Sequence, residues 1–391
     1  MSSDARTLTG DALVQALQDS RRHTLALVAD LDDAQWQVPQ RAGLNPLAWE
    51  LAHIAWFAEF WILRGPHRAD ASGRLQAAQP FQHAGPDELL DSARLPHAQR
   101  WRVALPSRAR VLGMLAAQLD ACLAALPAEG DDAALYFHRL ALFHEDMHGE
   151  ALTWLRASLG YAAPPDARLG SVRSAGMCEL PGGALLIGWP AYRLGFAFDN
   201  EQPARTVPLQ RFRIDRAPVS AGAYARFVDA GGYAEAALWP AAAANWRARK
   251  QAQHPARWRR AGNGWETRWF DRWLPLQPAQ PAIHLNAWES EAYARWAGRR
   301  LPSAAEWEHA ARSGQIEWGR SVWEWTADAF QPYPGFQPGP YRDYSAPWFG
   351  DHRELRGGAF ATQARLHDPV YRNFFLPDRT DLFTGFRTVE L

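Results

Sequence analysis

Two histidines four residues apart, His144 and His148, stand inside a long run of apolar residues with helical periodicity. On a helix, this spacing places both imidazoles on one face, where they can share a metal ion. The run covers residues 133–159, with two aspartates just before it and Gly160 at its end. Such a pair is often incidental, so a metal site requires a third ligand.

His53 is the best candidate for that third ligand. It lies in the segment 45–61, which opens with Asn45 as the expected N-cap and Pro46 at the first helical position. The apolar stripe of this segment includes Trp49 and His53, so the imidazole points toward the core of a bundle. Without the other two histidines, a buried neutral imidazole bonded to a backbone carbonyl would be the simpler interpretation.

Two further segments, residues 8–31 and 107–126, repeat apolar residues at helical spacing. Together with the two histidine-bearing segments, they predict a four-helix bundle. Bundles build metal sites from side chains on facing helices, so this architecture can bring the three imidazoles together.

The composition limits the classes of function. A chain of 391 residues is long enough for two domains, and its 42 basic and 42 acidic residues cancel. We therefore expect no nucleic-acid partner. The absence of a membrane-spanning apolar stretch and the polar start favour a cytoplasmic protein with no membrane partner. The two cysteines are expected to be reduced core residues.

The helical pattern stops near residue 160, and the Pro- and Gly-containing stretch after it reads as a linker. Beyond the linker, short extended runs alternate with many Gly, Pro and aromatic residues, and two short helices open on capping boxes, Asn286 with Glu289 and Ser303 with Glu306. This pattern predicts a loop-rich α+β domain and an α+β two-domain protein overall. The expected segments are a bundle over 1–162, a linker over 163–176 and a second domain over 177–391.

The second domain carries several separated motifs of one known family. It resembles the formylglycine-generating-enzyme, or sulfatase-modifying-factor, family, a variant of the C-type-lectin fold. The motifs are the runs LPGGALLIG at 180–188, FDNE at 198–201, GRRLPSAAEWE at 298–308, VWEWT at 322–326, LRGGA at 355–359 and GFR at 385–387.

The first domain resembles the DinB-type four-helix bundle, whose metal-binding members place one histidine on the second helix and a His-x-x-x-His pair on the last. The two domains in this order resemble the ergothioneine-pathway sulfoxide synthases and their relatives, including selenoneine synthase and the ovothiol-pathway enzymes. The resemblance implies that His53, His144 and His148 bind a non-haem iron(II), with dioxygen as co-substrate and hercynine, the trimethylated betaine of histidine, as acceptor.

The chemistry of the ligands agrees with this resemblance. Three neutral imidazoles on one side of an iron(II) leave the opposite side open for an imidazole substrate, a soft sulfur or selenium donor and dioxygen. Holding these small-molecule partners on one metal turns a three-body encounter into a local reaction.

The sequence departs from the ergothioneine branch around the substrates. That branch tends to have Gln where this chain has Met147, and an Asn-Trp-Asp run where this chain reads Arg372-Asn373-Phe374-Phe375. Phe375 replaces a carboxylate but keeps an aromatic face for a quaternary ammonium. We take these five residues as candidate substrate-binding residues. The catalytic tyrosine of that branch aligns near Gly339, with Tyr333, Tyr341 and Tyr344 close by, and we take Tyr341 and Tyr344 as the candidate catalytic residues.

These departures favour a selenoneine synthase that joins a selenosugar to hercynine. The alternatives are an ergothioneine-type sulfoxide synthase that uses cysteine or γ-glutamylcysteine, and an ovothiol-type synthase that acts on histidine. Arginines between the second and third helices hold thiol-peptide donors in the family, and the corresponding stretch here, Arg94 through Arg108, is basic but does not align.

Three readings from other classes compete. Residues 144–148 match the His-Glu-x-x-His signature of zinc hydrolases, with Glu145 as general base. The second is that the C-terminal domain generates formylglycine. That activity depends on a cysteine pair in the family, and no cysteine follows Cys178, so the sequence excludes it. A binding module with a structural metal would favour four ligands including thiolate, whereas three histidines with no nearby cysteine suggest an open coordination sphere.

Two nearby residues are not expected to bind the metal. His138 is expected to be a surface or packing residue, and Glu150 either orients a ligand histidine or is solvated.

Overall fold

The structure is a computed structural model that describes residues 5–71, 73–127 and 130–391. Contacts within the chain divide it into two units. The N-terminal unit runs to Leu155 and includes Leu194–Phe196, and the C-terminal unit comprises Arg156–Arg193 and Ala197–Leu391. Helices and strands both contribute, which confirms the predicted α+β class. Among the described residues, no helix combines the length and apolar character needed to cross a membrane.

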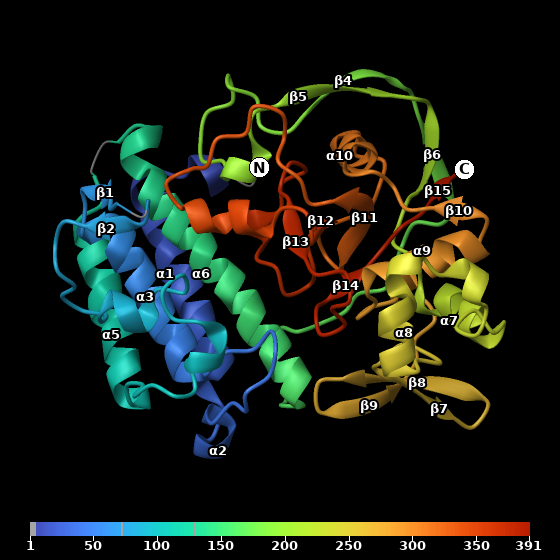
Figure 1. The fold of residues 1–391 in the computed structure, drawn as a ribbon, viewed down its shortest axis with the longest axis horizontal. Coiled ribbons are helices and arrows are strands. Elements are labelled where there is room, and N and C mark those ends of the chain that lie inside the picture. Colours follow the sequence, from blue (N-terminus) through green and yellow to red (C-terminus); the bar gives the residue numbers. More distant parts are fainter. Residues whose placement is uncertain (1–4, 72, 128–129) are drawn as a thin grey trace. The chain divides into compact units, whose positions relative to one another are not determined.

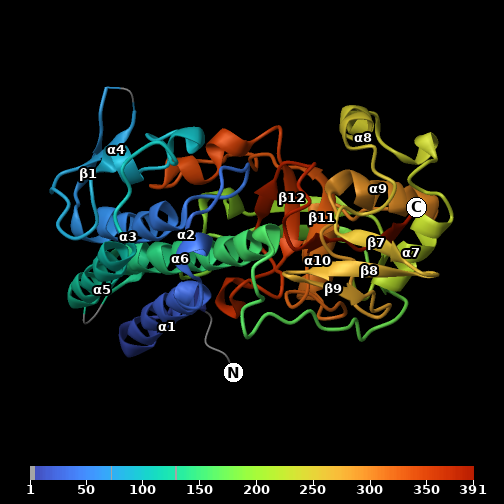
Figure 2. The same cartoon turned by 90° about the horizontal axis from the view of Figure 1, so that it is seen from below.

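Four long helices lie side by side in the N-terminal unit, as predicted (Figure 1). They are α1 (Gly10–Ala29), α3 (Leu47–Leu63), α5 (Arg108–Ala124) and α6 (Asp132–Leu159). The same bundle is seen from below in Figure 2. The shorter elements of this unit are η1 (Ala5–Thr7), α2 (Asp33–Trp36), β1 (His67–Ala69), β2 (Leu75–Ala77), α4 (Asp87–Leu90) and η2 (His97–Gln99).

The helix ends follow local rules at most positions. The Asp131 carboxylate accepts the Ala134 N–H at 2.9 Å at the start of α6, and Gly160 ends this helix with a φ of 71°. The expected cap of α3 is wrong. This helix begins at Leu47 after Pro46, and the Asn45 side chain donates to the Glu50 carboxylate instead of capping the backbone.

Helix α3 is buried on all sides over most of its length, so its few polar side chains need partners inside the bundle. Glu59 illustrates this requirement. Its carboxylate accepts the backbone N–H groups of Gln82 at 2.5 Å, His83 at 3.0 Å and Ala84 at 2.7 Å, and so fixes the chain that crosses this helix. Glu50 and His53, the other polar groups of α3, belong to the site described below.

Several small sheets build the C-terminal unit. One four-stranded sheet has the order β10-β15-β6-β3, and another has the order β13-β12-β11-β14, in which β14 is parallel to β11. The strands are β3 (Met177–Leu180), β4 (Gly183–Ile187), β5 (Arg205–Leu209), β6 (Phe212–Asp215), β7 (Trp258–Ala261), β8 (Gly264–Trp269), β9 (Arg272–Pro275), β10 (Arg299–Arg300), β11 (Trp323–Ala329), β12 (Arg353–Gly357), β13 (Asn373–Phe375), β14 (Thr384–Gly385) and β15 (Val389–Glu390).

Short helices accompany these sheets. They are α7 (Ala221–Asp229), α8 (Ala244–Lys250), α9 (Ala287–Trp296) and α10 (Ala304–Arg312), with 3₁₀ turns η3 (Asp199–Glu201), η4 (Ala236–Leu238), η5 (Ala241–Ala243), η6 (Arg342–Tyr344), η7 (Ala346–Trp348) and η8 (Ala364–Leu366). Both predicted capping boxes are present, Asn286 with Glu289 on α9 and Ser303 with Glu306 on α10.

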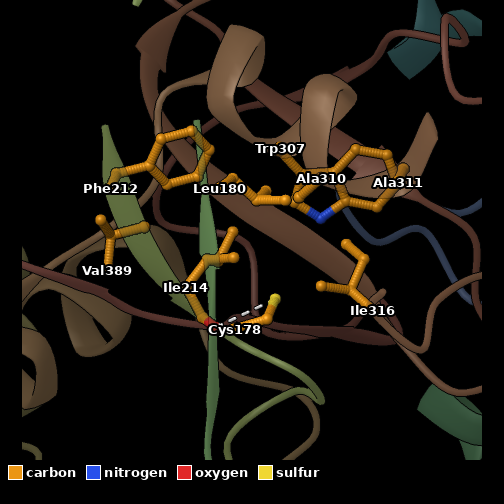
Figure 3. Close-up of a cluster of buried hydrophobic side chains, with 9 residues drawn as sticks. All are labelled: Cys178, Leu180, Phe212, Ile214, Trp307, Ala310, Ala311, Ile316 and Val389. Carbon is orange, nitrogen blue, oxygen red and sulfur yellow. Dashed lines mark hydrogen bonds between the residues drawn. The ribbon is translucent and has the colours of Figure 1, made fainter. Parts of the chain in front are cut away.

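One core cluster joins α10 to the sheet that contains β3 and β6 (Figure 3). Trp307 and Ala310 of α10 pack against Ile214 and Leu180, all of them buried. The Cys178 thiol lies beside Ile214 and donates to its carbonyl at 3.7 Å. Burial of the apolar face of α10 against this sheet forms one part of the core of the C-terminal unit.

Candidate metal centre

Three imidazoles converge inside the N-terminal bundle. His53 comes from α3, and His144 and His148 come from successive turns of α6. One ring nitrogen of each lies within 4.8 Å of the others, and the Nε2 atoms of His144 and His148 are 3.2 Å apart. Nitrogen ligands about 2.1 Å from one ion lie within roughly 4.2 Å of each other. The cluster is therefore close to the spacing that a shared metal needs.

Hydrogen bonds at Nδ1 orient two of the rings. The Nδ1 of His53 lies 2.7 Å from the Leu90 carbonyl oxygen, and the Nδ1 of His148 lies 2.5 Å from the Glu50 carboxylate. Each ring must donate its Nδ1 proton in such a bond when it is neutral, which leaves the Nε2 lone pair for a metal. The segment around α4 thus orients one ligand, and a side chain of α3 orients another.

Aromatic rings enclose the cluster. Trp49 stacks on His53 with ring centroids 4.8 Å apart and an interplanar angle of 9°, and Phe57 stacks on His144 at 3.5 Å and 4°. Trp56 lies on the other side of His53 at 5.6 Å. These contacts fix the ring planes and exclude water from their sides, so the imidazoles are already arranged before any ligand binds.

Burial keeps two of the imidazoles neutral. It lowers the pKa of His53 to about 3, assisted by the charge of His148 and opposed by the bond to Leu90. Burial likewise lowers the pKa of His144 well below its usual value, with further lowering from the charges of His148 and His53. Neutral imidazole is the form that binds metals, so the folded protein presents these ligands without a deprotonation step.

For the Glu50 carboxyl, neighbouring groups outweigh the effect of burial on the pKa. Burial alone would raise the pKa of its carboxyl, but the charge and hydrogen bond of His148 and the hydrogen bond of Asn45 lower it below its usual value. The site therefore contains one buried carboxylate next to a ligand ring, and this negative charge suits a divalent cation between the imidazoles.

The donor set fits an imidazole-binding metal with open positions. Three nitrogen ligands leave part of the coordination sphere for substrate or water, as in catalytic rather than structural sites. Imidazole suits iron, zinc, copper and nickel. The residues present are therefore compatible with the non-haem iron(II) expected from the resemblance.

The residue after His144 does not join the cluster. Both oxygens of Glu145 accept from Arg21 of α1, from Nε at 2.7 Å and from Nη2 at 3.0 Å. The next residue, Asp146, accepts from the Ser20 hydroxyl at 2.7 Å. The two carboxylates that lie between His144 and His148 in the sequence thus bind α1, and Glu145 is not placed as the general base of a zinc hydrolase.

Sequence reasoning missed Glu50, whose carboxylate contacts a ligand ring. The sequence offers Glu150 as a residue that could orient a ligand histidine. Glu150 is buried rather than solvated, and the Nδ1 of His148 faces Glu50. The available signal was an acidic residue one turn before His53 in an otherwise apolar helix. His138 is a buried packing residue with its Nε2 3.2 Å from the Cys122 carbonyl oxygen.

The candidate substrate residues of the C-terminal unit fall into two groups. Arg372 is 1% exposed and binds other residues of the same domain. Its Nη2 donates to the Glu354 carboxylate at 2.7 Å, and its guanidinium carbon lies 4.0 Å above the Tyr333 ring. We therefore withdraw Arg372 from the candidates, because Glu354 balances its charge and both Nη atoms donate inside the domain, while the Nε atom is buried without a partner among the described residues. Met147 lies in the other unit, half-buried on α6.

The other group is an aromatic cluster on β13 and the turn η6. Phe374 stacks on Phe330 at 4.1 Å and meets Tyr344 edge-on at 5.8 Å, and Tyr344 lies 5.9 Å from Tyr341. Phe375, on the opposite face of the strand, is covered by the Arg379 guanidinium at 5.2 Å. The Asn373 side chain accepts the Phe374 N–H at 2.8 Å.

Tyr344 keeps its proton at neutral pH. Burial raises the pKa of its phenol well above the usual value, with contributions from the neighbouring Tyr371. The hydroxyl donates to Tyr371 Oη at 3.3 Å, and the ring stacks on Phe198 at 4.6 Å. The structure thus groups Tyr341 and Tyr344 with Phe374.

Comparison with known proteins agrees with this architecture. The DinB superfamily profile matches residues 16–153, and that of the sulfatase-modifying factor enzyme 1-like domain matches 165–321 and 319–391. A protein of Mycolicibacterium thermoresistibile named hercynine oxygenase is 33% identical, over 96% of this chain and 94% of its own length. The chain belongs to the hercynine oxygenase family. This confirms the resemblance seen in the sequence motifs.

Other relatives separate the contributions of the two regions. The hercynine oxygenase of Mycobacterium tuberculosis is 33% identical over 95% of this chain and 96% of its own length. The formylglycine-generating enzyme of Streptomyces coelicolor is 28% identical over 59% of this chain and 92% of its own length. The hercynine oxygenases therefore match nearly the whole chain, including the region that contains the three histidines.

Proposed function

We propose that the protein is a non-haem iron(II) enzyme that uses dioxygen to form a carbon–selenium or carbon–sulfur bond on the imidazole of hercynine. We favour a selenoneine synthase that takes a selenosugar as donor. The observation that carries the proposal is the cluster of His53 and His144, both buried, with the half-buried His148, in a chain of the hercynine oxygenase family. Bound iron would supply open positions at which dioxygen and a soft chalcogen donor are activated together.

The side chains of this chain perform the remaining tasks. The Nδ1 atoms of His53 and His148 bond to Leu90 and Glu50, which leaves the Nε2 atom of each ring to bind a metal. The rings Trp49 and Phe57 hold two of the imidazoles in place and keep water from their faces. A rigid ligand set holds the reacting groups in a fixed geometry.

Aromatic faces in the C-terminal unit suit the acceptor. A trimethylammonium group is recognised by aromatic rings rather than by hydrogen bonds. Phe374, Tyr344 and Tyr341 offer such faces, and Phe374 and Tyr344 are half-buried. The Tyr344 hydroxyl, whose pKa is raised well above its usual value by burial, keeps its proton at neutral pH and is our candidate proton donor in this cluster.

Two arginines of the N-terminal unit give little support to a peptide thiol as donor, because they are used internally. Arg94 is bonded to Asp91, Glu88 and Gln76, and Arg108 donates to the Leu31 carbonyl and covers Trp36. Arg94 and Arg108 therefore have internal partners, whereas Arg102 of the same stretch is exposed, so only part of this basic stretch is available to hold the carboxylates of γ-glutamylcysteine. An uncharged sugar donor makes no such demand.

A thiol donor remains the second candidate, because the names of the relatives specify the acceptor and oxygen but no donor. An ovothiol-type enzyme acting on histidine is a further alternative, and it would not need aromatic faces for a trimethylammonium group. Zinc hydrolysis is disfavoured because Arg21 occupies the Glu145 carboxylate.

The test is an anaerobic reconstitution with iron(II), followed by exposure to air with hercynine and one donor at a time: a selenosugar, γ-glutamylcysteine or cysteine. Mass spectrometry identifies the product. A hercynine adduct with the isotope pattern of selenium supports the favoured reaction, and a sulfur adduct alone supports the second candidate. An adduct with histidine but not with hercynine would contradict the proposed acceptor.

A further inference from the structure

We propose that Glu50 and Arg100 are positioning residues that set the affinity and electron donation of the histidine cluster, an inference that rests on the proposed metal centre. Neither residue is a candidate ligand. Glu50 is 2% exposed on α3, and Arg100 is 9% exposed just after η2. A linked set of contacts joins them to two of the three imidazoles.

The first contact makes the cluster asymmetric. The Glu50 carboxylate lies 2.5 Å from Nδ1 of His148, whereas the Nδ1 of His53 faces the Leu90 backbone carbonyl at 2.7 Å. A carboxylate is the stronger acceptor and draws the ring proton toward itself, which increases the electron density at the opposite nitrogen. His148 is therefore expected to donate more electron density to a metal than His53 does.

The second contact holds this carboxylate in place. Its other oxygen accepts from the Asn45 amide, and the Asn45 carbonyl oxygen accepts from Nη1 of Arg100 at 2.6 Å. A buried carboxylate is costly unless its oxygens are bonded and a compensating charge is near. Arg100 provides that charge through one intervening amide.

The same guanidinium also supports His53. Its central carbon lies 3.7 Å above the Trp49 ring, and Trp49 stacks on His53 with an interplanar angle of 9°. The segment that carries Arg100 is tied to the start of α3 by His97, whose Nε2 lies 2.6 Å from the Leu44 carbonyl oxygen. Arg100 is thus connected to one ligand through hydrogen bonds and to another through stacked rings.

Two residues of the same unit serve as matched controls. Glu59 is an equally buried carboxylate on α3 that accepts backbone N–H groups, and Arg108 is an arginine whose guanidinium lies 4.6 Å above the Trp36 ring. Within the described part of the chain, the hydrogen bonds and ring contacts of these two side chains involve none of the three imidazoles. Glu59→Gln and Arg108→Met therefore report the cost of losing a buried charge or a stacked arginine away from the cluster.

The experiment titrates the full-length protein with cobalt(II) under anaerobic conditions, in competition with a chromophoric chelator, and records the cobalt absorption spectrum. We expect Glu50→Gln to weaken cobalt binding by about 10- to 100-fold, the range typical of lost partners of ligand side chains, and to shift the absorption bands. Arg100→Met should weaken binding by a smaller factor, and both controls should match the wild type in affinity and spectrum.

A double mutant tests whether Arg100 acts through Glu50. If it does, Glu50→Gln with Arg100→Met should lose less affinity than the product of the two single losses. Should Glu50→Gln fail to fold by circular dichroism, Asn45→Ala interrupts the same connection and should weaken cobalt binding while keeping the Glu50 carboxylate.

The outcomes separate the two proposals. A folded Glu50→Gln protein with wild-type affinity and spectrum would overturn the positioning role and leave the metal centre intact. Equal losses in Glu59→Gln would also overturn it, because the effect would then be one of stability. Failure of the wild type to bind cobalt would contradict the proposed metal centre itself.

Discussion

Arg21 of α1 and Glu145 of α6 form a buried, two-pronged ion pair that ties these helices together, with Nε to Oε1 at 2.7 Å and Nη2 to Oε2 at 3.0 Å. Gln118 adds to this junction by accepting from the same guanidinium at 2.9 Å. The carboxylate that a His-Glu-x-x-His motif would assign to catalysis is therefore a structural group in this fold, and it fixes the helix that carries His144 and His148.

Replacement of Glu145 by Gln should lower stability and leave metal binding unchanged. The substitution leaves the Arg21 charge buried without its partner, which typically costs about 3–5 kcal/mol of unfolding free energy. Chemical denaturation measures that loss, and the bound metal per chain is measured in parallel. Loss of metal with unchanged stability would instead support a role for Glu145 at the metal.

Replacement of His144 by Ala should abolish stoichiometric iron binding and product formation while the helical circular dichroism is retained. Two remaining imidazoles provide too few ligands to hold the ion. His138→Ala is the matched control, since His138 lies on the same helix, is buried and bonds to the Cys122 carbonyl. Iron bound at one equivalent in His144→Ala, or lost in His138→Ala, would contradict the ligand assignment.

Stability should depend on pH through Glu289 in the C-terminal unit. Burial raises the pKa of this carboxyl to about 7, against the opposing hydrogen bonds from the Asn286 N–H and the Tyr233 hydroxyl. Between pH 4.5, near its unfolded value, and about 7, the folded state keeps a proton that the unfolded state releases. The contribution of Glu289 to the unfolding free energy therefore falls as pH rises through this window.

Glu289→Gln removes this titration and keeps the shape of the side chain. The variant should gain stability relative to the wild type as pH rises from 5 to 8, by on the order of 3 kcal/mol for a shift of this size. Urea unfolding at both pH values, monitored by tryptophan fluorescence, provides the measurement. Parallel pH profiles for the two proteins would show that Glu289 is ionised in the folded state.

The parts of the site that depend on one helix could be predicted from the sequence, and the parts that depend on tertiary pairing could not. The spacing of His144 and His148, and the apolar stripe around His53, follow from helical periodicity. Glu50 meets His148 from another helix, 98 positions away in the chain, and no local pattern encodes that pairing. Arg372 is taken up by Glu354 because β12 and β13 are adjacent, which sequence spacing alone does not reveal.

The aromatic cluster leads to a prediction about the acceptor. Phe374 is half-buried between Phe330 and Tyr344, so its ring is held in place rather than free to rotate away. If this ring binds the trimethylammonium group of hercynine, Phe374→Leu removes a cation–π contact of about 1–2 kcal/mol. The KM for hercynine should then rise roughly 5- to 30-fold, while the KM for the donor stays constant.

Two comparisons separate this effect from a change in packing. Phe360→Leu alters a ring that packs on Phe383 at 4.6 Å and on Trp269 at 5.1 Å, and it should leave both KM values unchanged. Histidine lacks the trimethylammonium group, so its use as an acceptor should be insensitive to Phe374→Leu. A rise in the donor KM alone would move Phe374 to the donor side, because a ring that touches only the donor cannot alter the binding of the acceptor.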